Sequence, residues 1–450
     1  MNDERINLAL LGATDTQKVS IGAGVLASVD EVFSQSFGDQ PAVVVADENT
    51  FAAAGKEVQQ RFEVARRRLI DPFVFPRKPT LYAGYENIES LVEFLRGHDA
   101  IPVAVGSGTL NDIVKRAAYE CDRPYMVVAT AASMDGYTAF GASIARDGYK
   151  QTMTCPAPKA VLADIEVLVE APPEMTSAGY ADLLGKVTAG ADWLIADALG
   201  VEEIDPTVWS LVQGPLREWT GKPAELNAGD QEAMESLIEG LIVSGLAMQA
   251  AASSRPASGA EHLFSHLWEM EGLGHGEDHE GPPLSHGFKV GVGSVSIAAF
   301  YERILGRDLG DLNVEEIVRT WPSREEVEQS VRRSHKTPGL DEAAVAESLS
   351  KYIDAEQLAQ RLELLSERWP DLRDRLVEQF LSASRLREML QAAGCPTTPS
   401  EIGLSAEEFE TTYFRAQMIR RRYTVLDLAK ETGILEGCID ELFVSDGFPA

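Results

Sequence analysis

The sequence predicts two domains, an N-terminal α/β domain built on a parallel sheet and a C-terminal domain made only of helices. Short runs of β-branched and small apolar residues alternate with helical patterns up to residue 172. This alternation is typical of a doubly wound parallel sheet. After Pro172 and Pro173 the strand signals stop and helix-period patterns dominate. We therefore predict an α/β domain over residues 1–172 and a helical domain over residues 173–450.

Four strands are expected in the first domain. Each is a continuous apolar run that ends at a turn or polar residue, as in strands buried on both faces. The runs span residues 43–46, 101–105, 125–129 and 159–164. Parallel sheets bind ligands beyond the carboxyl ends of their strands. The residues that follow these runs are therefore candidate ligand contacts.

Three helices of the second domain have a clear apolar period, over residues 231–251, 353–365 and 371–393. The last is expected to stop at Gly394, with Pro396 just beyond it, because glycine and proline commonly end helices.

Charge and composition exclude several classes of function. The chain of 450 residues has 40 basic and 71 acidic side chains, a formal charge of −31. Such an excess argues against nucleic-acid and anionic-membrane partners, but an anionic small molecule needs only a local positive site. Four scattered cysteines without a CxxC pair, an acidic N-terminus and the lack of a long apolar run predict a cytoplasmic protein with reduced thiols, no signal peptide and no membrane span.

A glycine-rich turn follows the second predicted strand, at Gly106–Leu110, and opens a helix. Glycines let the backbone approach a phosphate, and the free amides of a helix N-terminus attract anions. Thr109 and Asp112 have the spacing of a helix cap. The turn is neither a complete GxGxxG nor a P-loop, so an ordinary strand-to-helix turn explains it equally well.

A second segment of small residues, Thr130–Ser133, ends the next predicted strand, and Asp135 follows it. Small residues permit close approach of a ligand, and Ser133 and Asp135 have side chains that bond hydroxyl groups. A turn with an Asp cap accounts for the same pattern.

Histidines cluster in the middle of the chain. A capping-box spacing from Ser258 to Glu261 predicts a helix that places His262 and His266 one turn apart on one face. His286 follows twenty residues after His266. His275 and His279 lie between them in a Gly- and acid-rich stretch, where they are either further donors or solvent-facing residues.

Upstream, Asp182 and Lys186 are spaced four residues apart in a predicted helix. One carboxylate with two imidazoles is a common ligand set for a catalytic divalent ion. A lone histidine on a helix is more often structural, so spacing by itself leaves the metal site open.

Taken together, five motifs resemble the sn-glycerol-1-phosphate dehydrogenase family. This family belongs to the superfamily of iron-containing alcohol dehydrogenases, glycerol dehydrogenase and dehydroquinate synthase. The motifs occur in the family's order at Gly106–Asp112, Thr130–Gly136, Gly179–Lys186 with Asp192-Trp193, Ser254–His262 and His286-Gly287. The segment Arg421–Asp427 is also similar. The resemblance covers nearly the whole chain and is most specific from Ser254 to Gly293.

The resemblance implies a dehydroquinate synthase-like fold, with a Rossmann-like nucleotide domain and an all-helical metal domain. It implies the reversible reduction of dihydroxyacetone phosphate to sn-glycerol 1-phosphate with NADH or NADPH. One divalent metal ion is implied, zinc first, with nickel or iron as alternatives. A homo-oligomer, dimer or larger, is expected.

The resemblance also implies roles for individual residues. The metal ligands would be Asp182, His262 and His286, with His266 and Asp182 catalytic. The substrate contacts would be Asp135, Asp182, His266, Arg255 and Lys186. The nucleotide contacts would be Asp47, Gly106, Ser107, Gly108, Thr109, Leu110, Thr130, Ala131, Ala132 and Ser133. Asp47 favours NAD over NADP, because an acid there repels a 2′-phosphate.

Two positions depart from the family pattern. The last ligand is often followed by Gly-Glu, whereas Phe288 stands after Gly287, and the His-Gly-Glu triplet occurs instead at His275. We favour His286, because the glycines up to Gly293 follow it at the family's spacing. Ala139 stands where the family has a cofactor-contacting serine, and alanine has no hydroxyl to make that contact.

Three alternatives stay open at this point. The chain could be a polyol dehydrogenase of the same superfamily without phosphate specificity, or a non-catalytic paralogue. A carbocycle-forming lyase like dehydroquinate synthase is a third alternative, but that branch carries Glu as its first ligand, and Asp182 speaks against it.

Overall fold

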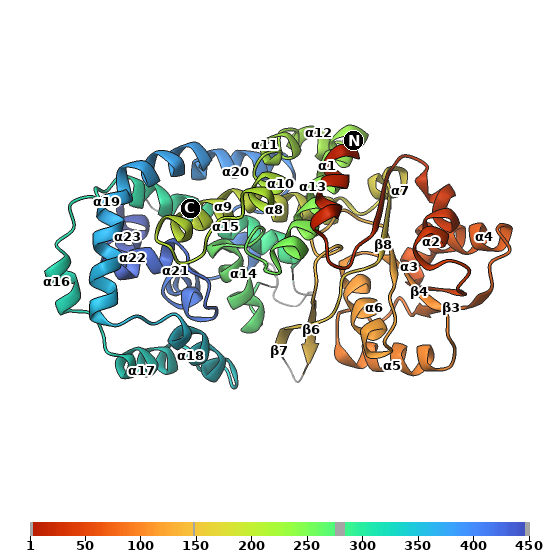
Figure 1. Ribbon diagram of the computed structural model, residues 1–450, viewed down its shortest axis with the longest axis horizontal. Coiled ribbons are helices and arrows are strands. Elements are labelled where there is room, and N and C mark those ends of the chain that lie inside the picture. The colour runs from red at the N-terminus through yellow and green to blue at the C-terminus, as the bar shows by residue number, and fades with distance from the viewer. Residues whose placement is uncertain (1–2, 147–148, 275–283, 446–450) are drawn as a thin grey trace. The chain divides into compact units, whose positions relative to one another are not determined.

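The computed structural model describes residues 3–146, 149–274 and 284–445 and divides into two compact units (Figure 1). Unit 1 contains residues 1–183, 210–254 and 392–394. Unit 2 contains residues 184–209, 255–391 and 395–450. Among the described residues, no helix combines the length and apolar character that a membrane span needs.

Unit 1 is built on a six-stranded sheet with the order β1-β8-β5-β4-β2-β3, and all its pairs are parallel. Its strands are β1 (Lys18–Gly22), β2 (Ala42–Asp47), β3 (Leu69–Phe75), β4 (Ile101–Gly106), β5 (Met126–Ala129) and β8 (Ala160–Asp164). From β2 the chain moves outward to β3 and then returns to β4 on the other side. The sheet order therefore reverses between β2 and β4, the usual place for a ligand crevice.

The four predicted strands are confirmed as β2, β4, β5 and β8. The two edge strands β1 and β3 were not predicted. Neither was the antiparallel hairpin of β6 (Ala142–Arg146) and β7 (Tyr149–Met153), which lies between β5 and β8 in the sequence.

Both faces of the central strands are covered. Alternate residues such as Val44, Val103 and Val128 form one apolar cluster with α2 and α4, and the intervening residues Val43 and Ala104 are also fully buried. Helix α6 packs against β4 and α5. Burial on both faces explains why these strands read as continuous apolar runs.

Helices α8 and α13 belong to unit 1, although they follow the last strand. Helix α13 packs on α1, α7 and β1. Unit 1 is therefore larger than the predicted domain of residues 1–172, which ends where the strands end. The division at residue 172 stays a prediction. The first helices of the chain are α1 (Asp3–Gly12), α2 (Val29–Phe37), α3 (Glu48–Thr50), α4 (Lys56–Val64), α5 (Tyr85–Arg96), α6 (Gly108–Glu120), α7 (Ile165–Val169), α8 (Pro173–Leu184), α9 (Lys186–Ala198), α10 (Pro206–Val212), α11 (Leu216–Trp219), α12 (Pro223–Asn227) and α13 (Gln231–Ala251).

In its described residues, unit 2 is helical, as predicted. Its core joins apolar residues of α9, α14, α15, α19, α21 and α22. The remaining helices are α14 (Ala260–Met270), α15 (His286–Leu305), α16 (Val314–Arg319), α17 (Arg324–Ser334), α18 (Leu340–Ser350), α19 (Ala355–Gln379), α20 (Ala383–Ala392), α21 (Ala406–Arg415), α22 (Val425–Glu431) and α23 (Leu435–Asp440), with the short turn η4 (Ala416–Met418) after α21.

One helix prediction was correct and two were wrong. Helix α13 has the predicted bounds. The helices predicted over residues 353–365 and 371–393 are not separated near residue 370. A single helix, α19, runs through Pro370 and ends at Gln379. The buried stripe of Leu365, Trp369 and Leu372 anchors the turns on both sides of that proline. Helix α20 ends near Gly394, whose φ of +77° is the left-handed conformation of a C-terminal glycine.

Candidate nucleotide site and metal centre

The glycine turn lies where the sheet predicts a phosphate site. Strand β4 ends at Gly106, and α6 begins at Gly108 with Ser107 as its N-cap residue. The Ser107 side chain makes no capping hydrogen bond, so the first-turn amides keep their capacity to bind an anion. Leu110 is buried and packs against Gly106, where a Cβ would lie 2.4 Å from its Cδ2. Only the main chain of Leu110 can therefore face a ligand.

The expected cap between Thr109 and Asp112 was wrong, because the helix begins before Thr109. Asp112 instead accepts a hydrogen bond from the amide of Ser143 at 3.0 Å. This contact ties α6 to the hairpin strand β6.

Asp47 stands at the carboxyl end of β2 and caps the next helix. Its Oδ1 accepts hydrogen bonds from the amides of Asn49 at 2.8 Å and Thr50 at 3.0 Å. Within the described chain, Oδ2 accepts none. Asp47 can thus cap the helix and still offer one oxygen to a ribose hydroxyl, as predicted for the adenosine side.

The Thr130–Ser133 segment follows β5 and is packed closely by α8. Thr130, Ala131 and Ala132 are buried. A Cβ on Gly179 would lie 1.9 Å from the carbonyl oxygen of Ala132, so only glycine fits there. The glycine of the Gly179–Lys186 motif therefore sets the distance between α8 and the predicted nicotinamide segment.

Asp135 and Asp182 meet within unit 1. The amide of Asp135 donates to Oδ2 of Asp182 at 3.0 Å, and Ser244 on α13 donates to Oδ2 of Asp135 at 3.0 Å. Asp182 is buried. The structure thus brings two of the predicted substrate residues together.

Lys115 on α6 holds the loop that carries Asp135. Its buried ammonium donates to the carbonyls of Gly136 at 2.9 Å, Ala139 at 2.8 Å and Gly141 at 3.0 Å. The sequence patterns did not single out this lysine, because its partners are main-chain atoms.

Two imidazoles of unit 2 form the core of the candidate metal centre. His262 on α14 and His286 at the first residue of α15 have ring centroids 5.4 Å apart. Nδ1 of His262 lies 2.7 Å from Oε1 of Glu261. We assign the proton to Nδ1, so Nε2 carries the lone pair that a metal binds.

Glu261 is itself held in place. Its Oε1 also accepts from the amide of Gly259 at 2.6 Å, and its Oε2 accepts from Thr188 at 2.7 Å. Burial alone raises the pKa of Glu261, but the hydrogen bond and charge interaction with His262, followed by the bonds from Thr188 and Gly259, lower that pKa overall. Ser258 was expected to cap α14, but Gly259 is the N-cap residue and Ser258 accepts a bond from Arg422.

His286 has a similar arrangement. Its Nδ1 lies 3.0 Å from the hydroxyl of Ser265 and 3.2 Å from Oε1 of Glu269. Both partners are on α14, so they orient the ring of a histidine on the neighbouring helix. Carboxylates that hold the distal nitrogen of an imidazole raise its basicity as a ligand.

Glycine explains how the two helices come close enough. A Cβ on Gly293 of α15 would lie 2.8 Å from the carbonyl oxygen of Glu261. The glycine therefore permits α15 to pack directly against the turn of α14 that carries His262.

His266 stacks on His286, with ring centroids 5.3 Å apart and an angle of 28° between the planes. The pKa of His266 is lowered to about 3, by burial first and then by the charges of His286 and Arg420, against the opposing effect of Glu269. The ring is therefore neutral at pH 7. His266, Glu269 and His286 also form a group whose potential ligand atoms lie within 4.8 Å.

Arg255, a predicted substrate contact, is hydrogen-bonded within the fold. It is 1% exposed, and its guanidinium donates to the carbonyls of Tyr423 at 2.9 Å and Asp192 at 2.7 Å. Glu202 lies 3.3 Å from its Nε. Arg255 therefore joins α9 to the segment before α22. Lys186 is fully buried at the start of α9.

Glu261 and Glu269 were missed as parts of the site. Glu261 adjoins His262, and Glu269 follows His266 by three residues on one helix face, so their spacing held a usable signal. The alternatives His275 and His279 lie outside the described residues.

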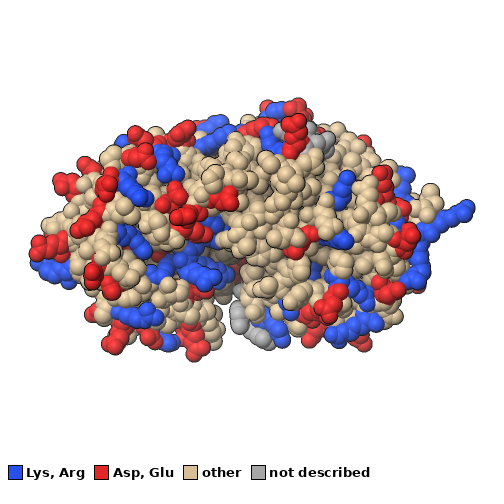
Figure 2. Space-filling view, in the orientation of Figure 1, with Lys and Arg blue, Asp and Glu red and all other residues tan. Residues whose placement is uncertain are grey.

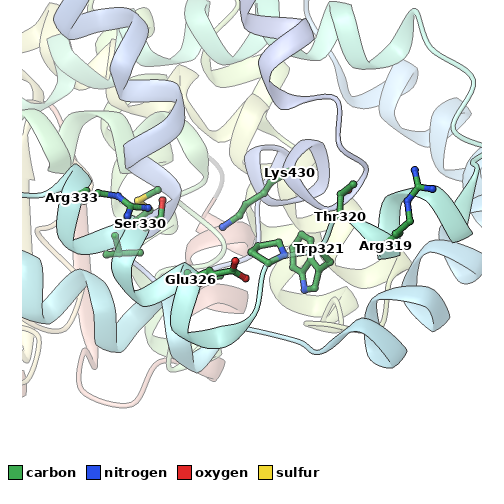
Figure 3. Close-up of a pocket in the computed structure, with 11 residues that line it drawn as sticks. Arg319, Thr320, Trp321, Glu326, Ser330, Arg333 and Lys430 are labelled. Carbon is green, nitrogen blue, oxygen red and sulfur yellow. The ribbon is translucent and has the colours of Figure 1, made fainter.

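A separate pocket of about 530 Å³ lies elsewhere in unit 2 (Figure 3). Arg319, Trp321, Glu326, Arg333 and Lys430 are among its lining residues. None of the predicted site residues lines it, and it brings no imidazole to its wall. We therefore do not regard it as the catalytic site.

Comparisons with known proteins identify the family and the fold. The family model of iron-containing alcohol dehydrogenase matches residues 20–172. A relative from Bacillus licheniformis, glycerol-1-phosphate dehydrogenase [NAD(P)+], is 33% identical over 352 residues, which cover 74% of this chain and 84% of the relative. A relative of the same name from Geobacillus thermodenitrificans is 30% identical over 398 residues, which cover 88% of both chains.

Solved structures support the fold alone. A probable glycerol dehydrogenase from Sinorhizobium meliloti superposes with a TM-score of 0.60 at 14% identity, over 95% of this chain and 99% of that one. Glycerol dehydrogenase from Schizosaccharomyces pombe gives 0.58 at 16% identity, over 97% and 93%. The predicted fold class is thereby confirmed. The motifs, the sheet and the sequence relatives agree, and this chain belongs to the glycerol-1-phosphate dehydrogenase family.

Proposed function

We propose that this chain catalyses the reversible reduction of dihydroxyacetone phosphate to sn-glycerol 1-phosphate, with NADH or NADPH as the hydride donor. The chain is an oxidoreductase acting on CH–OH groups, and its substrate is a small molecule. One observation carries the proposal most directly. In a chain 33% identical to a glycerol-1-phosphate dehydrogenase, two imidazoles on α14 and α15 are each held at Nδ1 by a carboxylate.

The proposed metal ligands are Asp182, His262 and His286. One carboxylate oxygen and two imidazole nitrogens suit zinc, nickel and iron, of which zinc is our first choice. A divalent ion held by these residues would supply Lewis-acid polarisation of the substrate carbonyl. Support comes from the chemistry of the donors and from the orientation of both rings by Glu261 and Glu269.

The nucleotide is proposed to lie along the carboxyl edge of the sheet. The amides of Gly106–Leu110 would bind the pyrophosphate, and Thr130–Ser133 would line the nicotinamide. Asp47 offers Oδ2 to the adenosine ribose. An acid at that place favours NAD, which we propose as the better cofactor of the two.

His266 is the proposed proton relay. Because its pKa is lowered to about 3 by burial first, the neutral ring does not itself release a proton at pH 7. In the reduction, we propose that His266 positions a water molecule that protonates the product oxygen. In the oxidation, the water positioned by the same ring would take the proton of the substrate hydroxyl. Asp135 would bind a substrate hydroxyl, held in place by Ser244.

The test is a substrate panel with metal analysis on the same sample. Purified protein should oxidise NADH or NADPH with dihydroxyacetone phosphate much faster than with unphosphorylated dihydroxyacetone, and a chelator should stop the reaction. His262→Ala should abolish both activity and bound metal. Equal rates with both ketones would instead favour a polyol dehydrogenase. The cytoplasmic location and the homo-oligomeric state stay predictions.

A further inference from the structure

The phosphate of the proposed substrate needs a positive partner, and two nearby arginines are already used by the fold. Arg255 donates to main-chain carbonyls of Asp192 and Tyr423. Arg422 donates to the hydroxyl of Ser258 at 2.5 Å and to its carbonyl at 2.9 Å. These bonds fix the segment after η4 to the start of α14.

Arg420 lies in the same segment, but its guanidinium makes fewer hydrogen bonds than those of Arg255 and Arg422. In the part of the chain that the structure describes, its guanidinium makes one hydrogen bond, from Nη1 to the carbonyl of Ile419 at a long 3.3 Å. It is partly exposed. The acid whose charge acts on it is Glu347, but a carboxylate oxygen of Glu347 accepts the amide of Arg421 at 2.7 Å.

The position of Arg420 relates it to the histidine cluster. Turn η4 packs against α14, the helix that carries His262 and His266. Arg415 pairs with Glu271 just after the end of α14, and Arg422 bonds Ser258 just before its start. The segment between them, which contains Arg420, therefore runs along the helix that carries His262 and His266.

The segment that contains Arg420 is rich in arginine, in a chain of net charge −31. Four arginines fall between residues 415 and 422. Figure 2 shows Lys and Arg side chains gathered where α14 and the segment after α21 lie in Figure 1. Burial lowers the pKa of Arg420, since loss of water disfavours the charged form. A bound anion would compensate that cost.

From these observations we infer that Arg420 binds the phosphate group of the substrate and makes the enzyme specific for a phosphorylated ketone. The inference rests on the proposed function. A guanidinium presents two parallel N–H groups that match two oxygens of a phosphomonoester. Arg420 would contact the phosphate equally in the bound substrate and in the transition state. Loss of these contacts should therefore change KM more than kcat.

The test compares Arg420→Met, Arg420→Lys and the control Arg421→Met in metal-loaded enzyme. Arg421 is the exposed neighbour, and within the described residues its side chain makes no hydrogen bond or ion pair. Arg420→Met removes the charge-assisted hydrogen bonds to the phosphate. Its KM for dihydroxyacetone phosphate should therefore rise about 10- to 100-fold. KM for unphosphorylated dihydroxyacetone, kcat and metal content should stay within about twofold. Arg420→Lys should fall between, and Arg421→Met should match the wild type.

Inorganic phosphate provides a second readout that needs no turnover. Calorimetry should show phosphate binding to the metal-loaded wild type and to Arg421→Met, and binding at least about 10-fold weaker to Arg420→Met. If the wild type does not reduce dihydroxyacetone phosphate, the proposed function fails, and this titration still decides whether Arg420 is a phosphate site. If Arg420→Met does not fold, the lysine variant decides. Unchanged phosphate affinity, or an equal rise in KM for both ketones, would overturn the inference.

Discussion

Glu269→Gln should weaken metal binding without removing it. Glu269 is almost buried, and its Oε1 lies 3.2 Å from Nδ1 of His286. The carboxylate holds the proton on Nδ1 and thereby directs the lone pair of Nε2 to the metal. Glutamine has the same shape and keeps an acceptor oxygen, but it lacks the charge.

The magnitude follows from the type of bond that is exchanged. A hydrogen bond to a charged group contributes about 1.5–3 kcal/mol, and a neutral one about 0.5–1.5 kcal/mol. The difference, about 1–1.5 kcal/mol, corresponds to about tenfold weaker metal affinity. Competition with a metal-sensitive dye measures this affinity directly. Glu271→Gln is the matched control, because Glu271 ends the same helix but pairs with Arg415 instead of an imidazole.

Two results would refute the reasoning. Unchanged affinity in Glu269→Gln would mean that the carboxylate does not orient His286. A loss of more than about a thousandfold would mean that Glu269 is itself a ligand, since ligand loss costs far more than loss of an orienting partner. The metal centre would then be the group of His266, Glu269 and His286, whose donor atoms lie within 4.8 Å.

Three further predictions concern the fold around the site. Gly179→Ala places a Cβ 1.9 Å from the carbonyl oxygen of Ala132. In a thermal-shift titration it should lower the melting temperature and weaken NADH binding. An unchanged melting temperature with unchanged NADH affinity would contradict the packing argument. Asp47→Ala removes both capping bonds and should cost about 0.5–2 kcal/mol in a denaturant titration, whereas no loss would mean that the cap is dispensable. Burial, followed by the charge of Arg415, lowers the pKa of His335 from the ordinary 6.5 to about 4. Between pH 4 and pH 6.5 the native state therefore binds fewer protons than the unfolded state. About 3 kcal/mol of stability should therefore be lost as pH falls from 6.5 to 4; His335→Leu should flatten that part of the stability curve, and an unchanged slope would count against the buried neutral imidazole.

The sequence predicted the central strands because their surroundings leave a simple pattern. Strands β2, β4, β5 and β8 lie inside the sheet order, where both faces are buried, and apart from the terminal Asp47 and Asp164 their residues are apolar or small. Strands β1 and β3 lie at its edges, and their partly exposed residues include Lys18 and Asp71. Edge strands tolerate polar residues and proline, so they carry a weaker signal.

The continuation of α19 through Pro370 illustrates the limit of local rules. Proline lacks an amide donor and usually interrupts a helix. Here Leu365, Trp369, Leu372 and Leu376 pack into one core, and burial of these side chains outweighs the lost backbone bond. Tertiary packing of this kind cannot be read from a window of sequence.

By itself the sequence determined the parallel sheet, the helical remainder and the glycine turn, and it predicted the carboxylate and imidazole donors. These features depend on residue type and on spacing along one element. Only the tertiary structure decided the partners of the site's side chains. Glu261 and Glu269 hold the imidazoles, Arg255 donates to main-chain carbonyls, and Arg420 makes one long hydrogen bond among the described residues. The physical reason is that hydrogen-bond partners of buried charges come from elements distant in sequence, and their pairing is fixed only when the helices pack.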